Sequence, residues 1–244
     1  MNCEQFVNEA ERLFSLNPSV TLPDDNKLHL LYELTEIMLK VNESMNLTTI
    51  TDHSQIILKH YLDSLTVSAY IPHGASVIDV GCGAGFPSLP LALCREDIRI
   101  TALDSTAKRT AYVQETAELL GIKNLTTITD RAESLAKKPE HREKYSIAVA
   151  RAVADLPVLC ELCLPFVKTG GAFISMKASK GDEEFERAGN AIKLCGGANP
   201  KIVSADITSN GTDYEKRRII ITEKVEKTPK IYPRNFAQIS KKPL

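Results

Sequence analysis

The sequence predicts an α/β fold in which a helical extension precedes a mostly parallel sheet of seven strands. Three features of the 244-residue chain support this prediction: helical spacing of apolar residues before residue 70, alternation of short apolar strands with helices after residue 75, and a glycine-rich turn behind the first strand. Alternating strands and helices imply right-handed crossovers and therefore mainly parallel strands. A chain of this length accommodates one such domain with an appendage.

Residues 1–70 have the apolar spacing of amphipathic helices. One helix is marked by apolar residues three or four positions apart: Leu28, Leu31, Leu34, Ile37 or Met38, and Val41. A second helix is predicted over residues 55–70, where apolar residues recur in the same way. We therefore expect residues 1–70 to form a helical extension packed on the domain made by residues 71–223.

From about residue 75, short apolar strands alternate with helices. The expected strands are 76–80, 98–103, 125–129, 145–150, 171–177, 201–206 and 217–223. A helix is expected from Ala107 to Leu120, and Gly121 follows it in a position that suits a left-handed turn. No helical pattern separates the last two strands, and Asn210-Gly211 is a turn signal there. The seventh strand is therefore expected to run antiparallel.

Composition indicates an ordinary globular chain. Charged residues make up 25% and the formal net charge is −1, so any contact with RNA must come from a local basic patch. No apolar run approaches membrane-spanning length, and the N-terminus lacks the basic and apolar regions of a signal peptide. Six scattered cysteines fit a reducing compartment, so we expect a cytoplasmic protein with no membrane contact.

Cys160 and Cys163 form the only C-x-x-C pair that invites a metal-site interpretation. They lie within a helical pattern of leucines, and no second cysteine pair or nearby histidine supports them. Buried helix positions are the better interpretation, and no metal is expected.

The stretch from Val77 to Pro87 is the strongest functional signal. An apolar strand containing Asp79 leads into Gly81-Cys82-Gly83-Ala84-Gly85, and a helix is expected to start at Pro87. Such junctions hold nucleotide-like ligands, because glycine lets the backbone approach closely and the helix start offers free N–H groups. The third glycine comes one residue too early for the G-x-G-x-x-G of NAD-binding proteins. The alternative is a glycine-rich turn without a ligand.

The compact G-x-G-x-G form, preceded by an acid, resembles motif I of the S-adenosylmethionine (AdoMet)-dependent methyltransferases. This resemblance implies a Rossmann-like, seven-strand methyltransferase sheet with an antiparallel last strand, in agreement with the strand pattern. It also implies that AdoMet is the cofactor and that Gly81, Gly83, Gly85 and Phe86 bind it.

Two later segments are expected to contact the cofactor as well. Asp104 ends the second strand about 20 residues beyond the glycine loop, where an acid accepts hydrogen bonds from ribose hydroxyls. Asp104 also suits a helix N-cap, and the two roles are compatible. After the third strand, the N–H of Ala132 is expected at the adenine edge, with Glu133 beside it. The alternative for this loop is a solvated turn.

Arg151 directly follows the apolar fourth strand, in the run Ala150-Arg151-Ala152. An unpaired guanidinium is too costly to bury by accident, so Arg151 is expected to face the cleft where methyl transfer occurs. A salt bridge at the rim of the sheet is the alternative.

These segments together resemble the bacterial glucose-inhibited division protein B family, the 16S ribosomal RNA guanine-N7 methyltransferases. The resemblance covers nearly the whole chain. Its segments are Asn46-Leu47-Thr48-Thr49-Ile50, His60-Tyr61-Leu62-Asp63-Ser64-Leu65, Asp79 to Pro87, Asp104-Ser105 with Lys108-Arg109, Asp130-Arg131-Ala132-Glu133, Ala150-Arg151-Ala152, Tyr232-Pro233-Arg234 and Lys241-Lys242-Pro243-Leu244.

Two segments depart from the family pattern. Many members carry an aromatic residue where this chain has Val41-Asn42, and many carry Pro-Gly-Thr-Pro where it has Asn235-Phe236-Ala237-Gln238. Neither departure touches the cofactor motifs, but the second changes the tail that follows Arg234.

The resemblance implies methyl transfer from AdoMet to N7 of a guanine in the decoding-region loop of 16S rRNA. N7 has a free lone pair at neutral pH, so no general base is required and alignment is the main catalytic task. Asp63 is the candidate for stabilising the product side, with His60 and Arg151 orienting the base. The alternative is that the His60-x-x-Asp63-Ser64 segment only ties the N-terminal helices to the cofactor loop.

Local clusters of basic residues are expected to hold the RNA backbone. The candidates are Lys108, Arg109, Arg234, Lys241 and Lys242, the last three in a basic tail (residues 224–244) that we expect to be extended. Each cluster alone is also typical of a solvated surface. The expected partner is 16S rRNA or the small ribosomal subunit, and nothing in the sequence resembles a dimer seam, so a monomer is expected. The rival functions are a small-molecule or protein methyltransferase and a non-catalytic RNA-binding protein.

Overall fold

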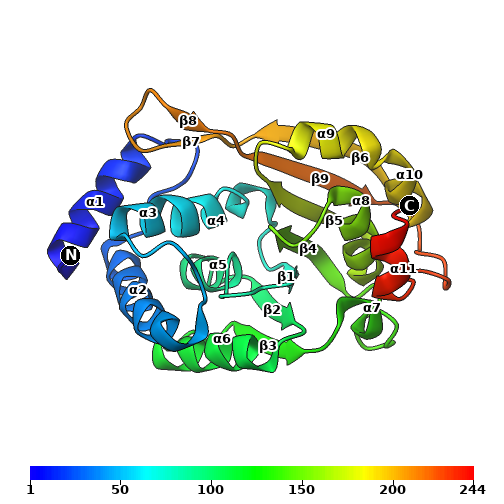
Figure 1. Ribbon diagram of the computed structural model, residues 1–244, viewed down its shortest axis with the longest axis horizontal. Coiled ribbons are helices and arrows are strands. Elements are labelled where there is room, and N and C mark those ends of the chain that lie inside the picture. The colour runs from blue at the N-terminus through cyan, green and yellow to red at the C-terminus, as the bar shows by residue number, and fades with distance from the viewer.

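Seven strands form one sheet at the centre of the computed structural model, which describes residues 1–244 (Figure 1). The strands are β1 (Ser76–Val80), β2 (Arg99–Asp104), β3 (Leu125–Thr129), β4 (Tyr145–Arg151), β5 (Val167–Lys177), β6 (Gly197–Ser204) and β9 (Arg218–Lys224). Their order is β3-β2-β1-β4-β5-β9-β6, and β9 runs antiparallel to both β5 and β6. The predicted seven-strand sheet with an antiparallel last strand is therefore confirmed.

The Asn210-Gly211 turn serves a smaller hairpin than the sequence suggested. It lies between β7 (Ile207–Thr208) and β8 (Tyr214–Glu215), which form a separate two-stranded sheet inserted between β6 and β9. Gly211 has a φ of +81°, and the Asn210 side chain accepts hydrogen bonds from two backbone N–H groups beyond it. Asn17, which lies just after the first helix of the chain, exchanges two hydrogen bonds with the Thr208 backbone and so holds the hairpin (Figure 1).

Alternation along the strands divides the apolar core into two layers. Val77 and Val149 face one layer, whereas Ile78 and Ala148 face the other, as the period of two in a strand requires. The first layer contains α5 (Ser88–Cys94) and α6 (Ala107–Leu119). The second contains α7 (Ala132–Leu135), α8 (Leu156–Cys163) and α10 (Gly189–Leu194), next to α9 (Gly181–Arg187) and a 3-10 turn, η3 (Leu164–Phe166).

Helix α6 ends as its sequence predicts. Gly121 adopts a φ of +68°, and the N–H of Ile122 donates to the carbonyl of Ala117. This bond satisfies a carbonyl that the end of the helix would otherwise leave free.

The N-terminal residues form helices that share the first core layer with the sheet. They are α1 (Cys3–Ser15), α2 (Asp25–Met45), α3 (His53–Ile56), the π-helical turn η1 (Ile57–Leu62), α4 (Asp63–Leu65) and the 3-10 turn η2 (Ser68–Tyr70). The segment expected as one helix over 55–70 thus begins at His53 and contains a π turn. π turns are rare and occur often at functional sites, and this one carries His60.

The C-terminal tail is only partly extended. It ends in α11 (Phe236–Lys241), which packs on α8 and buries Ile239 (Figure 1). Arg142 holds the preceding segment by donating hydrogen bonds to the carbonyls of Thr228, Pro229 and Tyr232.

Arg234 anchors this tail through an ion pair with a buried carboxylate. Its guanidinium donates to both oxygens of Glu161, at 2.9 Å and 2.6 Å, and Glu161 is 0% exposed. Arg234 is the one cationic partner of Glu161, and its side chain is still 23% exposed, so its contact with RNA stays a prediction.

Cys160 and Cys163 are buried positions of α8, and burial raises the pKa of both thiols. The interpretation of the C-x-x-C pair as helix core is confirmed. The structure contains no cluster of three metal-ligating side chains, and none of its helices is both long and apolar enough to cross a membrane.

The Glu161–Arg234 pair predicts an asymmetric loss of stability. Arg234→Met leaves a carboxylate buried without a partner and should lower the free energy of unfolding by about 3–5 kcal/mol. Glu161→Gln should cost only about 1 kcal/mol, because Arg234 is 23% exposed and can turn to water. Urea unfolding of both variants measures the difference. Equal, small losses would contradict the assignment of Glu161 as a buried anion.

Candidate active site

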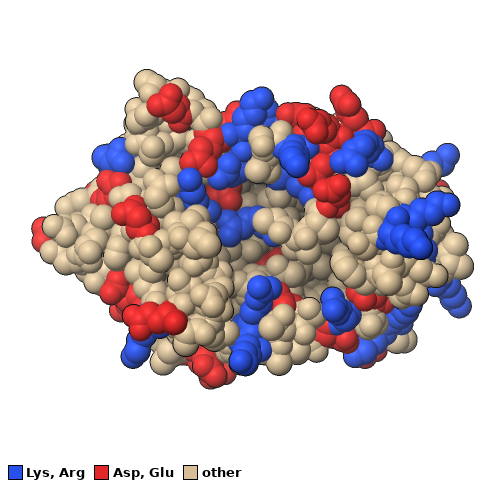
Figure 2. Space-filling model, in the orientation of Figure 1, with Lys and Arg blue, Asp and Glu red and all other residues tan.

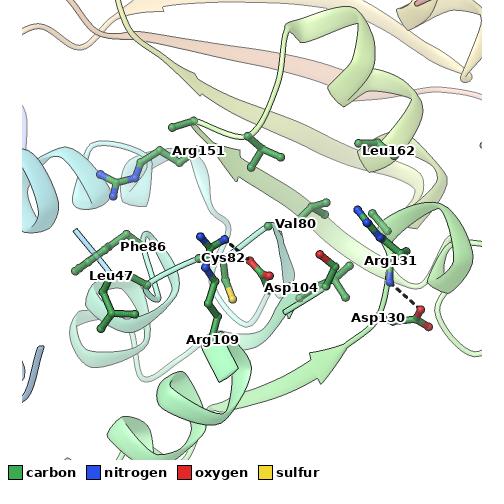
Figure 3. Close-up of a pocket in the computed structure, with 18 of the residues that line it drawn as sticks. Leu47, Val80, Cys82, Phe86, Asp104, Arg109, Asp130, Arg131, Arg151 and Leu162 are labelled. Atoms are coloured by element: carbon green, nitrogen blue, oxygen red, sulfur yellow. Dashed lines mark hydrogen bonds and ion pairs between the residues drawn. The ribbon is translucent and has the colours of Figure 1, made fainter. Parts of the chain in front are cut away.

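The carboxyl ends of the parallel strands surround a cavity of about 410 Å³ (Figure 3). Parallel strands bring the loops that follow them to one edge of the sheet, so segments far apart in sequence meet there. The predicted site residues that line the cavity are Gly81, Gly83, Phe86, Asp104, Ala132, Glu133, Arg151, His60 and Arg109. Asp63 and Gly85 do not line it.

The glycine loop is fastened to the end of β2 by its own backbone. The N–H groups of Gly81 and Cys82 both donate to the Leu103 carbonyl, at 2.8 Å and 2.9 Å. Gly81 and Gly83 have φ angles of +83° and +56°, which side chains rarely adopt. A Cβ on Gly83 would meet only one atom, at 4.0 Å, so it would project into open space at the cavity.

Gly85 has a packing role instead of the expected cofactor contact. A Cβ at this position would lie 2.5 Å from Cδ1 of Leu89. The glycine therefore lets the loop turn tightly onto α5, and its contact with the cofactor stays a prediction.

Asp104 connects the glycine loop to the start of α6. Its Oδ2 accepts a hydrogen bond from the N–H of Gly83 at 3.0 Å, and its Oδ1 accepts one from Thr106 at 2.8 Å. The N-cap residue of α6 is Thr106, so Asp104 supports the helix start from two residues before it. Each carboxylate oxygen retains a lone pair, and Asp104 lines the cavity, so both expected roles are geometrically compatible.

One end of the cavity is formed by the loop after β3. Asp130, Arg131, Ala132 and Glu133 line it together with Leu162 of α8. Figure 3 shows Asp130, Arg131 and Leu162 on one side of Asp104, opposite Phe86 and Arg151.

Phe236 of α11 also lines the cavity, and the guanidinium of Arg131 lies 5.8 Å from the centre of its ring. Phe236 is not among the site residues that the sequence predicts. The one sequence feature that could have drawn attention to Phe236 is its place in Asn235-Phe236-Ala237-Gln238, the tail segment that departs from the family pattern.

Arg151 lies at the other end of the cavity, as expected. Its Nη1 donates to the Lys59 carbonyl at 3.0 Å and to Asp63 Oδ2 at 2.9 Å. The guanidinium is also 5.3 Å from the centre of the Phe86 ring. Arg151 thus lines the cleft and also forms a salt bridge at the rim of the sheet. The sequence had offered these two arrangements as alternatives.

Asp63 is held between two guanidinium groups. Its second oxygen, Oδ1, accepts from Nε of Arg217 at 2.9 Å, and the residue is only 7% exposed. Both oxygens thus accept hydrogen bonds from arginine, and Asp63 lines the adjoining groove rather than this cavity. The expectation that Asp63 stabilises the reaction product stays a prediction, and its two ion pairs join the N-terminal helices to Arg151 and Arg217 rather than to the glycine loop of the alternative.

The His60 side chain is an uncharged, stacked aromatic ring in this site. Its ring stacks on Phe86, with 4.5 Å between ring centres and 16° between planes, and Nε2 lies 2.9 Å from Oγ1 of Thr48. Nδ1 is buried without a partner. Burial, assisted by the Arg151 charge, lowers the pKa of His60 to about 4, so the imidazole is uncharged at neutral pH.

Asp79 is buried directly beneath the glycine loop. Ser88, the first residue of α5, donates to its Oδ2 at 2.5 Å, while Oδ1 has no partner. Burial raises the pKa of this carboxyl to about 7. The sequence showed an acid before the glycines but not that this acid is 0% exposed.

A second, basic groove of about 590 Å³ adjoins the cavity and shares Arg151, Ala152 and Val153 with it. Its lining has six basic and three acidic residues, in a chain whose net charge is −1. Figure 2 shows basic side chains around a hollow in the middle of this face. This local excess of positive charge is the kind of patch that a polyanion requires.

The other basic residues expected at RNA lie on two exposed helix ends. Lys108 and Arg109 are exposed in the first turn of α6, and Arg109 also lies 3.7 Å from Asp104. Lys241 and Lys242 are exposed at the end of α11.

Known proteins are similar over nearly the whole chain. The family model described as rRNA small subunit methyltransferase G matches residues 27–211. A Halalkalibacterium halodurans protein named Ribosomal RNA small subunit methyltransferase G is 42% identical over 236 residues, covering 96% of this chain and 95% of the relative. The protein of the same name from Limosilactobacillus reuteri is 45% identical and covers 86% and 88%.

Solved structures share the fold at low sequence identity. A SAM-dependent O-methyltransferase from Thermotoga maritima superposes with a TM-score of 0.53 at 12% identity, covering 79% of this chain and 73% of that chain. TYW2 from M. jannaschii, in complex with AdoMet, superposes with a TM-score of 0.50 at 15% identity, covering 67% of this chain and 73% of that chain. These similarities support the methyltransferase fold already evident from the strand order.

The buried carboxyl of Asp79 predicts a pH-dependent stability. In the folded protein it keeps its proton up to about pH 7, but an unfolded aspartate loses it near pH 4, so folding takes up a proton between these values. Stability should therefore fall as pH rises through this window. Relative to Asp79→Asn, the wild type should lose about 2 kcal/mol of unfolding free energy between about pH 5 and pH 7. Urea unfolding across this range provides the measurement, and a constant difference would mean that Asp79 is ionised in the folded state.

Proposed function

The chain belongs to the rRNA small subunit methyltransferase G family, and we propose that it transfers a methyl group from AdoMet to N7 of a guanine in the decoding-region loop of 16S rRNA. The observation that carries this proposal is the junction at Arg151, where a cavity fit for a nucleoside cofactor opens into a groove rich in basic residues. A small-molecule methyltransferase needs the first feature but not the second.

The residues of the cavity fit AdoMet. Gly83 leaves room for close backbone approach, and Asp104 has lone pairs free for ribose hydroxyls. The N–H of Ala132 is our candidate for the adenine edge, with Glu133 beside it. A volume of about 410 Å³ lies within the range of cofactor sites. Bound there, AdoMet supplies an electrophilic methyl group on a cationic sulfur.

The remaining catalytic task is to orient guanine, because N7 needs no proton removed before it attacks. The stacked His60 and Phe86 rings are uncharged and line the methyl end of the cavity. A neutral His60 adds no repulsion as positive charge develops on the guanine, whereas an imidazolium would oppose it. We assign the orientation of the base to Arg151 and this aromatic pair.

Asp63 acts as a positioning residue in this proposal. It fixes the guanidinium groups of Arg151 and Arg217 at 2.9 Å each, and two arginines sharing one carboxylate retain a net positive charge. Such a cluster suits a phosphate of the target nucleotide. Phosphate contacts would orient the RNA without reading its sequence.

We propose 16S rRNA, alone or in the small ribosomal subunit, as the partner of a monomeric, cytoplasmic enzyme. Lys108, Lys241 and Lys242 are candidates for additional phosphate contacts outside the groove, because all three are exposed and none forms an ion pair with an acidic side chain.

The proposed function is tested by incubating the purified protein and labelled AdoMet with small subunits and naked 16S rRNA from cells that lack the enzyme. We expect one labelled guanine in the decoding-region loop, detected by chain cleavage specific for 7-methylguanine. Label on ribosomal proteins, or on free nucleosides at a similar rate, would overturn the assignment.

Arg151 and Asp63 should act as a unit in catalysis. Arg151→Ala should slow single-turnover methylation at saturating rRNA by about 100-fold, since misplaced reacting atoms lose the benefit of alignment. AdoMet affinity should change much less than the rate. Asp63→Asn should slow the reaction through Arg151, so the double variant should be hardly slower than Arg151→Ala.

Additive losses in the double variant would instead give Asp63 a role of its own. Lys241→Ala with Lys242→Ala is the matched control. It should weaken rRNA association mildly, reduce its salt dependence and leave the saturated rate unchanged.

A further inference from the structure

Phe236 is an aromatic residue of the tail at the wall of the cofactor cavity. It is the first residue of α11, is 39% exposed and lines the cavity together with Arg131, Ala132 and Leu162. The Arg131 guanidinium faces its ring at 5.8 Å. The ring therefore has one charged neighbour, and part of its surface is exposed at the cavity.

The segment that carries Phe236 is anchored on both sides. Arg234 precedes it with the ion pair to Glu161, and Ile239 follows it with a 0% exposed side chain. The Asn235 side chain caps α11 by accepting from the N–H of Gln238 at 3.0 Å. Three contacts within six residues thus fix the position of the ring without using the ring itself.

The order of residues along the cavity indicates which part of a bound nucleoside lies next to Phe236. Arg151 and Phe86 mark the methyl end, and Asp104, the proposed ribose contact, lies between that end and Arg131 (Figure 3). A nucleoside held at Asp104 with its methyl-bearing arm toward Arg151 must extend its base toward Asp130, Arg131 and Leu162. This is the end to which α11 contributes.

We propose that Phe236 and Arg131 form the outer wall of the adenine pocket, so that the C-terminal tail is part of the AdoMet site. This inference rests on the proposed function. Every base has a planar face that stacks on aromatic rings, and Phe236 presents such a ring where adenine would lie.

Calorimetric titrations of AdoMet and S-adenosylhomocysteine test the proposal in the absence of rRNA. Both molecules have the same adenosine, but only AdoMet has the methyl group. Phe236→Ala should weaken both by a similar factor, about 5- to 50-fold, as expected when one base–aromatic stack is lost. Phe236→Tyr should bind within about twofold of wild type, because the ring is retained. Gln238→Ala, on the exposed face of the same helix, is the matched control and should be unchanged.

The possible results distinguish a failure of the proposed Phe236 wall from a failure of the proposed function. If wild type binds neither molecule, the proposed function fails, and the wall with it. If wild type binds both and Phe236→Ala binds equally well, only the wall is overturned. A loss for AdoMet but not for S-adenosylhomocysteine would place Phe236 at the methyl end and also overturn it. Phe236→Leu keeps the apolar packing of the tail but has no flat ring. An AdoMet affinity between that of wild type and that of Phe236→Ala supports stacking, even if Phe236→Ala loosens the tail.

Discussion

The Asp63 carboxylate, shared between Arg151 and Arg217, is the interaction on which the methyl end of the site depends. It joins three segments that are distant in sequence: the N-terminal helical extension, the end of β4 and the start of β9. A carboxylate that is 7% exposed is stable here only because both of its oxygens meet guanidinium groups. The same cluster lies where the cavity adjoins the basic groove, because Arg151 lines both.

The cofactor end is built differently, mainly from backbone. The N–H groups of Gly81 and Cys82 donate to the Leu103 carbonyl of β2, and Asp104 accepts hydrogen bonds from two further N–H groups. Because these bonds come from a rigid parallel sheet, the cradle is formed before a ligand arrives, which lowers the entropy cost of binding. The tail then adds a side-chain wall through Phe236, held by anchors in a different part of the domain.

Burial decides the charge state of two groups in this region. His60 is neutral because desolvation disfavours its cation, and Asp79 holds its proton to about pH 7 because desolvation disfavours its anion. Both effects reduce fixed charge next to a reaction in which a cationic methyl donor becomes neutral and the guanine becomes cationic. The remaining charge is concentrated in the arginine cluster and the groove, where the phosphates of RNA would lie.

The sequence by itself determined the sheet, its antiparallel last strand, the glycine loop and the positions of Asp104 and Arg151 at strand ends. These features are local, since apolar periodicity and turn residues specify them over a few positions. Tertiary structure alone decided the partners. Arg234 has the sequence context of an RNA contact but forms an ion pair with Glu161, and Asp63 is enclosed by two arginines. Phe236 reaches the cavity only because α11 docks on α8. Ion pairs between residues 73 to 154 positions apart depend on how the elements pack, and no local pattern encodes that packing.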